Sequence, residues 1–335
     1  MKALTTDHSP TVVARVLGVS RSSHYRTPNS GGRAAEDAWL TQEIERIFKQ
    51  HKRRYGSPRI HIQLKQEGVR CGENRVARLM RKAGIRAKTP RRKRPRTTDS
   101  RHGGPVAPNL LKGMTIDKAN QVWAMDITYI AQGKTWAYLA AVLDLYLHKV
   151  VGWELSETLH AEVACKALQR AQKHQGYPSG VIIHSDRGCQ YASESFIALS
   201  EYFDCVRSMS AKGNCYDNAT MESFFGVLKR EELNDFDFDS VKSIRAQLFE
   251  YIETYYNRIR IHSALGMSPE DFEVRQNVEA PSAEFFQALV APQVGKKSAG
   301  ERTPQPRPVV ATLGYPLAGC SPAEPASVSP NNTSI

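Results

Sequence analysis

Residues 123–130 read Trp-Ala-Met-Asp-Ile-Thr-Tyr-Ile. Aromatic and β-branched side chains dominate this stretch, which is typical of a β-strand. A single charged residue, Asp126, interrupts the apolar run. A carboxylate among apolar strand residues costs free energy unless it is paired, hydrogen-bonded or bound to a metal. Asp126 is therefore either a strand-end residue that faces a turn or a functional group.

The residues that follow alternate between strand and helix patterns. Strands are predicted over 136–146, 150–155, 181–184 and 205–209, and helices over 161–175, 194–202, 218–233 and 241–259. The order is three strands, then helix, strand, helix, strand and helix. This order predicts an α/β fold with a mixed sheet flanked by helices. The corresponding catalytic core is expected over residues 116–275.

The region before the core is predicted to be helical. Residues 36–89 carry apolar residues at helical spacings, with Gly68 and Gly84 as stops, and we expect an all-α region there. Residues 1–30 have a short helix, glycine and helix pattern that is typical of a helix-turn-helix segment. The alternative for this short segment is a small packing element.

A basic linker is predicted over residues 90–115. Ten Lys and Arg residues and one acid lie between Arg81 and Arg101, interleaved with prolines. Such a composition cannot form a core and favours extended chain. The block of four consecutive cations is expected to track DNA phosphates, although a solvated charge run is the simpler alternative. Its members are Arg91, Arg92, Lys93 and Arg94.

Residues 276–335 are predicted to form a disordered tail. Nine of the eighteen prolines lie after residue 280, and no apolar periodicity accompanies them.

The net charge of +12 favours a polyanionic partner, with nucleic acid ahead of membrane. No apolar run approaches the ~18 residues of a membrane span, and residues 1–10 show no secretory signal. The six cysteines lack metal-binding spacing, so reduced thiols are expected. These features predict a cytoplasmic, nucleoid-associated protein without membrane contact.

Two further acids are candidates for the chemistry. Asp186 closes the predicted strand 181–184, and ligands of α/β sheets gather at the carboxyl ends of strands. Glu222 lies on the predicted helix 218–233. Each has an ordinary alternative role, as a loop-capping aspartate or as a solvated helix glutamate.

Asp126, Asp186 and Glu222 together predict a metal site. Three crowded carboxylates repel one another, and a multivalent cation compensates that repulsion. Oxygen ligands select Mg²⁺ or Mn²⁺, and two such ions about 4 Å apart can promote phosphodiester cleavage. We therefore expect two Mg²⁺ or Mn²⁺ ions as cofactors.

Three sequence words and one spacing carry a family resemblance. The words are residues 184–191, His-Ser-Asp-Arg-Gly-Cys-Gln-Tyr, then 213–225, and 256–262, Tyr-Asn-Arg-Ile-Arg-Ile-His. Asp186 and Glu222 have 35 residues between them. This pattern resembles OrfB-type insertion-sequence transposases of the retroviral-integrase catalytic-core superfamily, which have a ribonuclease-H-like core.

The resemblance implies metal-dependent cleavage and strand transfer of DNA by the D,D-35-E triad Asp126, Asp186 and Glu222. The implied substrates are double-stranded element ends and target DNA. The resemblance also implies that the helical region 36–89 binds DNA. An upstream partner reading frame of the OrfA type is also implied, and a homo-oligomer on DNA is expected.

Three residues near the triad have a secondary role. His184 is expected to orient a carboxylate, or else to be a packed strand histidine. Asn218 and Lys229 share a helix face with Glu222 and are expected to contact DNA, Lys229 at a substrate phosphate. The alternative for Lys229 is a solvated helix charge.

Two rival functions remain open. A metal nuclease would hydrolyse DNA without joining it. A DNA-binding repressor derived from an inactive transposase would bind DNA without cutting it. The intact triad argues against the repressor.

Overall fold

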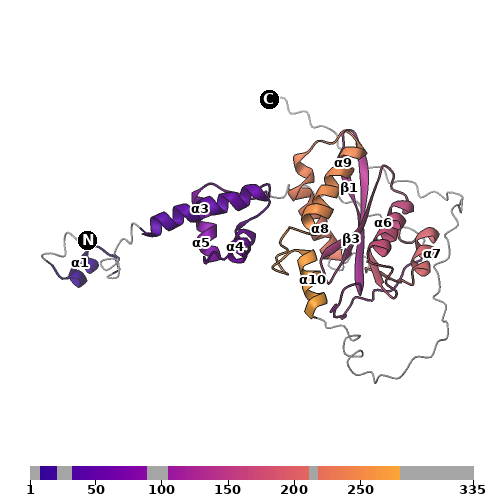
Figure 1. Ribbon diagram of the computed structural model, residues 1–335, viewed down its shortest axis with the longest axis horizontal. Coiled ribbons are helices and arrows are strands. Elements are labelled where there is room, and N and C mark those ends of the chain that lie inside the picture. The colour runs from indigo at the N-terminus through magenta and orange to yellow at the C-terminus, as the bar shows by residue number, and fades with distance from the viewer. Residues whose placement is uncertain (1–7, 21–31, 89–104, 211–217, 280–335) are drawn as a thin grey trace, which may run out of the picture. The chain divides into compact units, whose positions relative to one another are not determined.

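The computed structural model describes residues 8–20, 32–88, 105–210 and 218–279 (Figure 1). These residues belong to two compact units, which divide the chain after Lys88. The basic block at residues 91–94 and most of the predicted tail lie outside the described residues. Within the described ranges, no helix is long and apolar enough to cross a membrane.

The first unit is all-α, as predicted. Its helices are α1 Pro10–Val16, α3 Gly32–Gln50, α4 Ser57–Gln66 and α5 Glu73–Lys82. The apolar residues predicted to face a core in the last three helices are buried, with the exception of Ile62, which is half-buried. They are Ile44, Ile47, Phe48, Ile60, Leu64, Val76, Leu79 and Met80.

A glycine turn joins α4 to α5. Gly68 has a φ of +82°, and the amide of Val69 donates to the carbonyl of Leu64 at 2.8 Å, which ends α4. Helix α3 is tied to α5 by Asp37, whose carboxylate accepts from Arg75 Nε at 2.8 Å and Arg78 Nη2 at 2.7 Å. The sequence thus folds here as a helix-turn-helix-like arrangement.

The second unit contains a five-stranded mixed sheet. Its strands are β1 Val122–Gln132, β2 Thr135–Asp144, β3 Lys149–Ser156, β4 Ile182–Ser185 and β5 Val206–Met209, in the order β3-β2-β1-β4-β5. The first three strands pair antiparallel, whereas β4 pairs parallel with both β1 and β5. The predicted ribonuclease-H-like mixed sheet is confirmed.

Helices cover both faces of this sheet (Figure 1). On one face, α6 Ala161–His174 and α7 Glu194–Tyr202 pack on a core that includes Trp123, Met125 and Val151. Strand side chains alternate between faces, so Asp126 points to the opposite face. There α8 Ala219–Glu231 packs against β1.

The approach of α6 to β3 is very close at Gly152. A Cβ on this residue would lie 2.5 Å from the carbonyl oxygen of Ala167 and 2.6 Å from the amide of Ala171. Only glycine leaves room for the helix backbone at this point.

The C-terminal part of the described chain differs from the predicted single helix over 241–259. Helix α9 Val241–Phe249 passes into a π-helical segment, η4 Glu250–Tyr256. The wider turns of this segment bury Tyr251, Ile252, Tyr255 and Tyr256 together.

Helix α10 Pro269–Glu279 extends four residues beyond the expected end of the core at 275. It is held on the turn between β2 and β3, because the hydroxyl of Tyr146 donates to Gln276 at 2.7 Å and Lys149 pairs with Glu273 at 2.5 Å. A short 3-10 turn, η3 Leu233–Asp235, follows α8.

Candidate active site

The candidate site lies where the parallel strands β1 and β4 run side by side, in the middle of β1 and just after the end of β4. Met125 of β1 pairs with Ser185 of β4 in parallel register. Asp126 and Asp186 each follow one of these paired residues, so the two carboxylates come from adjacent strands at the same level of the sheet. The structure therefore brings together the two aspartates that the sequence singled out.

Local hydrogen bonds fix both aspartates. One carboxylate oxygen of Asp126 accepts from the amide of Ile127 at 2.8 Å. Asp186 Oδ1 accepts from the amide of Gly188 at 2.9 Å, which closes a tight turn after β4. A side chain at Gly188 would crowd this turn, since a Cβ there would lie 3.0 Å from Asp186 Oδ1.

The electrostatics of Asp126 show that acids converge on it. Burial, followed by repulsion from Asp186 and more weakly from Glu222, raises the pKa of Asp126 to about 8. Hydrogen bonds from the Ile127 amide and the Asn218 side chain oppose this rise. Without a cation, the carboxyl group of Asp126 therefore keeps its proton near neutral pH.

Glu222 lies in the first turn of α8 and is exposed. Its charge contributes to the raised pKa of Asp126, but this contribution is smaller than that of Asp186. Among the residues that the structure describes, no three His, Cys, Asp or Glu side chains are grouped closely enough to hold a metal ion. The three carboxylates are thus neighbours without forming a closed ligand set.

The donor chemistry of the site fits a divalent cation. The carboxylates of Asp126, Asp186 and Glu222 offer only oxygen ligands, which hard cations prefer. Burial and then repulsion from the other acids raise the pKa of Asp126, and a bound cation would relieve both effects. Binding through all three groups would require Glu222 to approach the aspartates.

Two residues predicted to contact DNA lie beside Asp126. Asn218, which precedes α8, hydrogen-bonds to the carboxyl group of Asp126 through its side chain. Lys229 on α8 is half-buried, and burial lowers its pKa while the charge of Asp126 opposes that shift. Sequence reasoning placed both residues on the Glu222 face but did not anticipate that Asn218 bonds to Asp126 or that the charge of Asp126 acts on Lys229.

His184 is fully buried in β4. Its Nδ1 shares a hydrogen bond of 2.9 Å with the hydroxyl of Ser208, its partner in the register of β4 and β5. The same hydroxyl accepts from the amide of Leu110 at 3.0 Å. The ring is thus held by the neighbouring strand, which fits the packed-histidine alternative.

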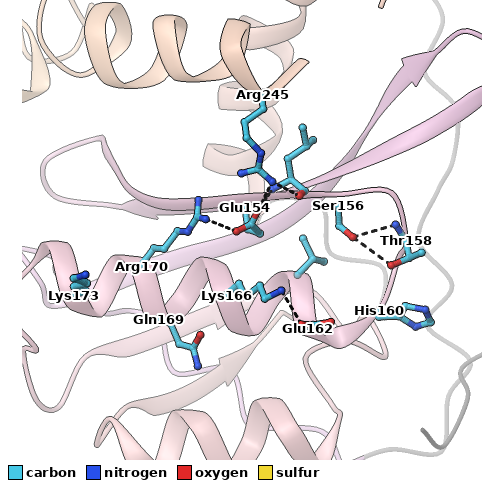
Figure 2. A pocket seen from close by; sticks show the side chains of 12 residues that line it. Glu154, Ser156, Thr158, His160, Glu162, Lys166, Gln169, Arg170, Lys173 and Arg245 are labelled. Carbon is cyan, nitrogen blue, oxygen red and sulfur yellow. Dashed lines mark hydrogen bonds and ion pairs between the residues drawn. The ribbon is translucent and has the colours of Figure 1, made fainter. Parts of the chain in front are cut away.

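A cavity of about 490 Å³ lies elsewhere in this unit, between the end of β3, helix α6 and Arg245 of α9 (Figure 2). Buried Glu154 pairs there with Arg170 at 2.7 Å and with Arg245 at 2.6 Å. None of the predicted site residues lines this cavity. The charge of Glu154 is balanced by the two arginines, and the acids of the candidate site belong to β1, the turn after β4 and α8.

Comparisons with known families agree with this arrangement. The family described as Integrase core domain matches residues 117–215, and a second form of the same description matches residues 222–276. An HTH-like domain matches residues 34–94.

Two solved structures resemble part of this chain at low sequence identity. The HTLV-2 integrase catalytic core domain in complex with magnesium is 18% identical, with a TM-score of 0.37, over 46% of this chain and 95% of that chain. The catalytic domain of Mos1 transposase with Raltegravir and Mg is 16% identical, with a TM-score of 0.34, over 41% and 72%.

Curated relatives match over most of their length. The "Insertion element IS600 uncharacterized 31 kDa protein" of Shigella sonnei is 40% identical over 78% of this chain and 97% of its own. "Transposase InsF for insertion sequence IS3A" of Escherichia coli (strain K12) is 41% identical over 78% of this chain and 92% of its own. The chain therefore belongs to the InsF-type insertion-sequence transposases, polynucleotidyl transferases with an integrase core domain.

Proposed function

We propose that this transposase cuts the ends of an insertion sequence and joins them to target DNA at a site formed by Asp126, Asp186 and Glu222. The observation that supports this best is the parallel register of β1 and β4, which sets the two aspartates on adjacent strands at one level. Thirty-five residues separate Asp186 from Glu222, which is the spacing of a D,D-35-E site.

The proposed cofactors are two Mg²⁺ or Mn²⁺ ions, which the three carboxylates would hold. Such a pair supplies activation of the attacking oxygen and stabilisation of the leaving oxygen in an in-line displacement at phosphorus. The attacking group is water in the cleavage step and a DNA 3′-hydroxyl in the joining step.

The surrounding residues have supporting roles in this proposal. Asn218 orients the carboxyl group of Asp126 through its side-chain hydrogen bond. Lys229, half-buried near Asp126, offers a positive charge to a substrate phosphate. His184 steadies the end of β4 through Ser208, so that Asp186 leaves the strand in a fixed direction.

DNA binding is proposed for the parts before the core. Residues 36–89 would dock on duplex DNA through the helix-turn-helix-like arrangement, with the segment 1–30 as an accessory. The linker 90–115 would track phosphates through Arg91, Arg92, Lys93 and Arg94. The core would span 116–275, and the part of the tail after about residue 280 would be dispensable for folding.

We further propose that the protein acts as a homo-oligomer on DNA in the bacterial nucleoid, with an OrfA-type partner protein that recognises the terminal repeats. Oligomer formation can be tested by light scattering with and without element-end DNA.

The proposed chemistry is tested with amide variants of the triad. Asp126→Asn, Asp186→Asn and Glu222→Gln keep side-chain shape but remove negative charge. The substrate is a labelled duplex that carries the DNA flanking the gene, and both cleaved and joined products are measured. Each variant should cut at least about 10³-fold more slowly. Glu162→Gln, an exposed glutamate of α6 paired with Lys166, serves as the matched control.

The same assay separates the rivals. Cleavage by the wild-type protein without joined product would favour a nuclease. Tight binding of the duplex without metal-dependent cleavage would favour a repressor. Cleavage that survives in the amide variants would show that the chemistry lies outside this triad.

A further inference from the structure

The outer half of the β1–β2 hairpin is covered on one face only. Strand side chains alternate between faces, and two cross-strand pairs share the open face, Tyr129 with Tyr138 and Ala131 with Trp136. The side chains of Ala131 and Trp136 are exposed, and those of Tyr129 and Tyr138 are half-buried. The residues between them point to the opposite face and are buried: Thr128, Ile130, Ala137 and Leu139.

This open face is aromatic, although the solvated face of an antiparallel sheet is ordinarily polar. The ring of Tyr129 makes edge-on contacts with Tyr138, at a centroid distance of 5.2 Å, and with Trp136, at 6.3 Å. Aromatic pairs across two strands stabilise a hairpin. Yet Trp136 keeps 41% of its surface exposed, and exposed apolar surface of this kind is typical of a binding site. Tyr129, Tyr138 and Trp136 thus form an aromatic row with open ring surface at its outer end.

The charge of the hairpin suits a polyanionic ligand. Between Asp126 and Asp144 the sequence has no acid, and its single charged residue is Lys134. Lys134 is exposed in the turn, next to Gly133, whose φ of +54° lets the two strands reverse direction. A DNA strand that passes over this turn therefore meets a cation and no carboxylate of the hairpin.

The aromatic row lies on the hairpin that carries Asp126, beyond the candidate site. Strand β4 pairs with β1 only as far as Met125, so the outer half of the hairpin extends past it. At about 3.4 Å per residue, Tyr129 lies about 10 Å along the strand from Asp126, and the Ala131–Trp136 pair lies about 17 Å away. The side chain of Asp126 points to the opposite face. The row is therefore placed for DNA a few nucleotides from the reacting phosphate, since stacked nucleotides rise about 3.4 Å each.

We propose that the aromatic row binds unpaired bases of the DNA substrate by stacking, a few nucleotides from the bond that is cut or joined. The inference deepens the proposed function and rests on it, because DNA must be the substrate of the neighbouring site. Every base has a π-face, so rings such as Trp136 hold a separated strand without reading its sequence. The bases of an intact duplex stay stacked on one another, and the row therefore selects unpaired DNA.

The test compares two DNA ligands with the full-length protein in EDTA, so that no cleavage occurs. One is a blunt duplex, and the other is the same duplex with a short single-stranded extension that contains 5-iodouracil. Affinity is measured by fluorescence anisotropy, and stacking by photocrosslinking of the iodouracil to the protein. The wild type should bind the extended duplex more tightly and crosslink within the β1–β2 hairpin.

Two substitutions of Trp136 separate stacking from plain apolar contact. Trp136→Leu keeps an apolar side chain but removes the ring. It should lose about tenfold in affinity for the extended duplex, lose most of the crosslink, and bind the blunt duplex like the wild type. Trp136→Tyr keeps a ring and should restore most of the affinity. Melting temperatures without DNA show whether each variant is folded, which the exposure of Trp136 favours.

Tyr202→Leu is the matched control. Tyr202 ends α7, is 71% exposed, and makes a similar edge-on contact with Phe203 at 5.1 Å. This variant removes an exposed ring away from the hairpin and should bind both DNA ligands like the wild type.

Three outcomes would overturn the inference. Unchanged affinity of Trp136→Leu for the extended duplex would show that the ring does not stack on bases and that the row has another occupant, such as a protein segment. Equal losses on both ligands would show a contact with duplex DNA. A wild type without preference for the extended duplex would remove the selection of unpaired DNA. In each case metal-dependent cutting by the wild type would leave the proposed function intact, whereas failure to cut or join would count against that function alone.

Discussion

Arg260 donates from Nε and Nη2 to the two carboxylate oxygens of Glu231, at 2.7 and 2.8 Å. The two side chains are only 2% and 1% exposed. Glu231 ends α8, the helix that carries Glu222 and Lys229, and Arg260 lies just after η4. This buried pair therefore fixes the helix that supplies two residues of the proposed site.

Loss of one partner should destabilise the fold strongly. Arg260→Met removes both short hydrogen bonds to the buried carboxylate of Glu231 and leaves only Arg230 nearby, at 3.7 Å. Breaking such a buried pair costs about 3–5 kcal/mol. Equilibrium unfolding in urea measures the change. Arg258→Met is the control, because Arg258 is exposed and its pairing with Glu270 is a surface contact of 3.4 Å. A loss in Arg260→Met no larger than in this control would contradict the assigned role.

The raised pKa of Asp126 predicts a pH dependence of stability without metal. A carboxyl group whose pKa is raised on folding stabilises the fold fully at low pH, and that contribution is lost as the pH rises through the folded value, here about 8. Asp126→Asn has no ionisable carboxyl group at this position, so the variant does not lose this stability as the pH rises. The variant should melt higher than the wild type at about pH 9 in EDTA, and the difference should shrink toward about pH 5. Differential scanning calorimetry across this range measures both proteins.

Asp117→Asn serves as the control for this series, since Asp117 is exposed before β1. Its melting curve should follow the wild type at each pH. A difference between Asp126→Asn and the wild type that grows on acidification would reverse the sign and refute the prediction.

Cleavage should depend on a hard metal. The proposed ligands are carboxylates without thiols, so Mg²⁺ or Mn²⁺ should support cutting and a zinc-selective chelator should leave it intact. The measurement is nicking of a labelled duplex over a metal titration. Activity that persists in excess EDTA would exclude the two-metal proposal.

The basic block should govern affinity rather than chemistry. Replacing Arg91, Arg92, Lys93 and Arg94 with alanine should weaken binding to every duplex sequence. The dependence of log affinity on log salt should flatten by up to about 0.9 per lost contact. Salt titrations of duplex binding measure this slope. The control replaces Lys166 and Lys173, exposed on α6, and should leave the slope unchanged; equal slopes in both variants would remove the phosphate-tracking role.

Gly152 should tolerate no side chain. In Gly152→Ala the new Cβ meets backbone atoms of α6 at 2.5 and 2.6 Å, so the helix must move away from β3. Overpacking of this kind costs about 1–3 kcal/mol. Gly226→Ala is the control, because that glycine lies on α8 with open space around it and alanine favours a helix by up to about 1 kcal/mol. If Gly226→Ala lowered the free energy of unfolding in urea more than Gly152→Ala did, α6 would have to pack more loosely on β3 than the Gly152 distances indicate.

Much of the fold follows from local patterns in the sequence. The predicted strand 123–130 lies inside β1, because its aromatic and branched residues pack on both faces of a central strand. The helix predicted over 161–175 corresponds to α6 within one residue at its C-terminal end, since its apolar positions repeat at helical spacing. Asp126 and Asp186 could be singled out because Asp126 interrupts an apolar strand and Asp186 directly follows one, where ligands of α/β sheets gather.

Other features depend on contacts that no local pattern encodes. Glu231 and Arg260 are 29 residues apart, and nothing in either neighbourhood shows that they meet. The π-helical turns of η4 arise because several tyrosines must be buried together. The open aromatic face of the hairpin becomes apparent only once the register of β1 and β2 sets Tyr129 opposite Tyr138.

The parallel pairing of β1 with β4 also has a consequence for how the protein is made. Asp126 and Asp186 are neighbours in the sheet but 60 positions apart in the chain, and the crossover through α6 must form before they meet. The hairpins of β1, β2 and β3 involve short loops and can close first. During translation, the three antiparallel strands β1, β2 and β3 can therefore fold before β4 is made and brings Asp186 next to Asp126. We expect the nascent polypeptide to lack the paired aspartates of the proposed site until translation has passed β4.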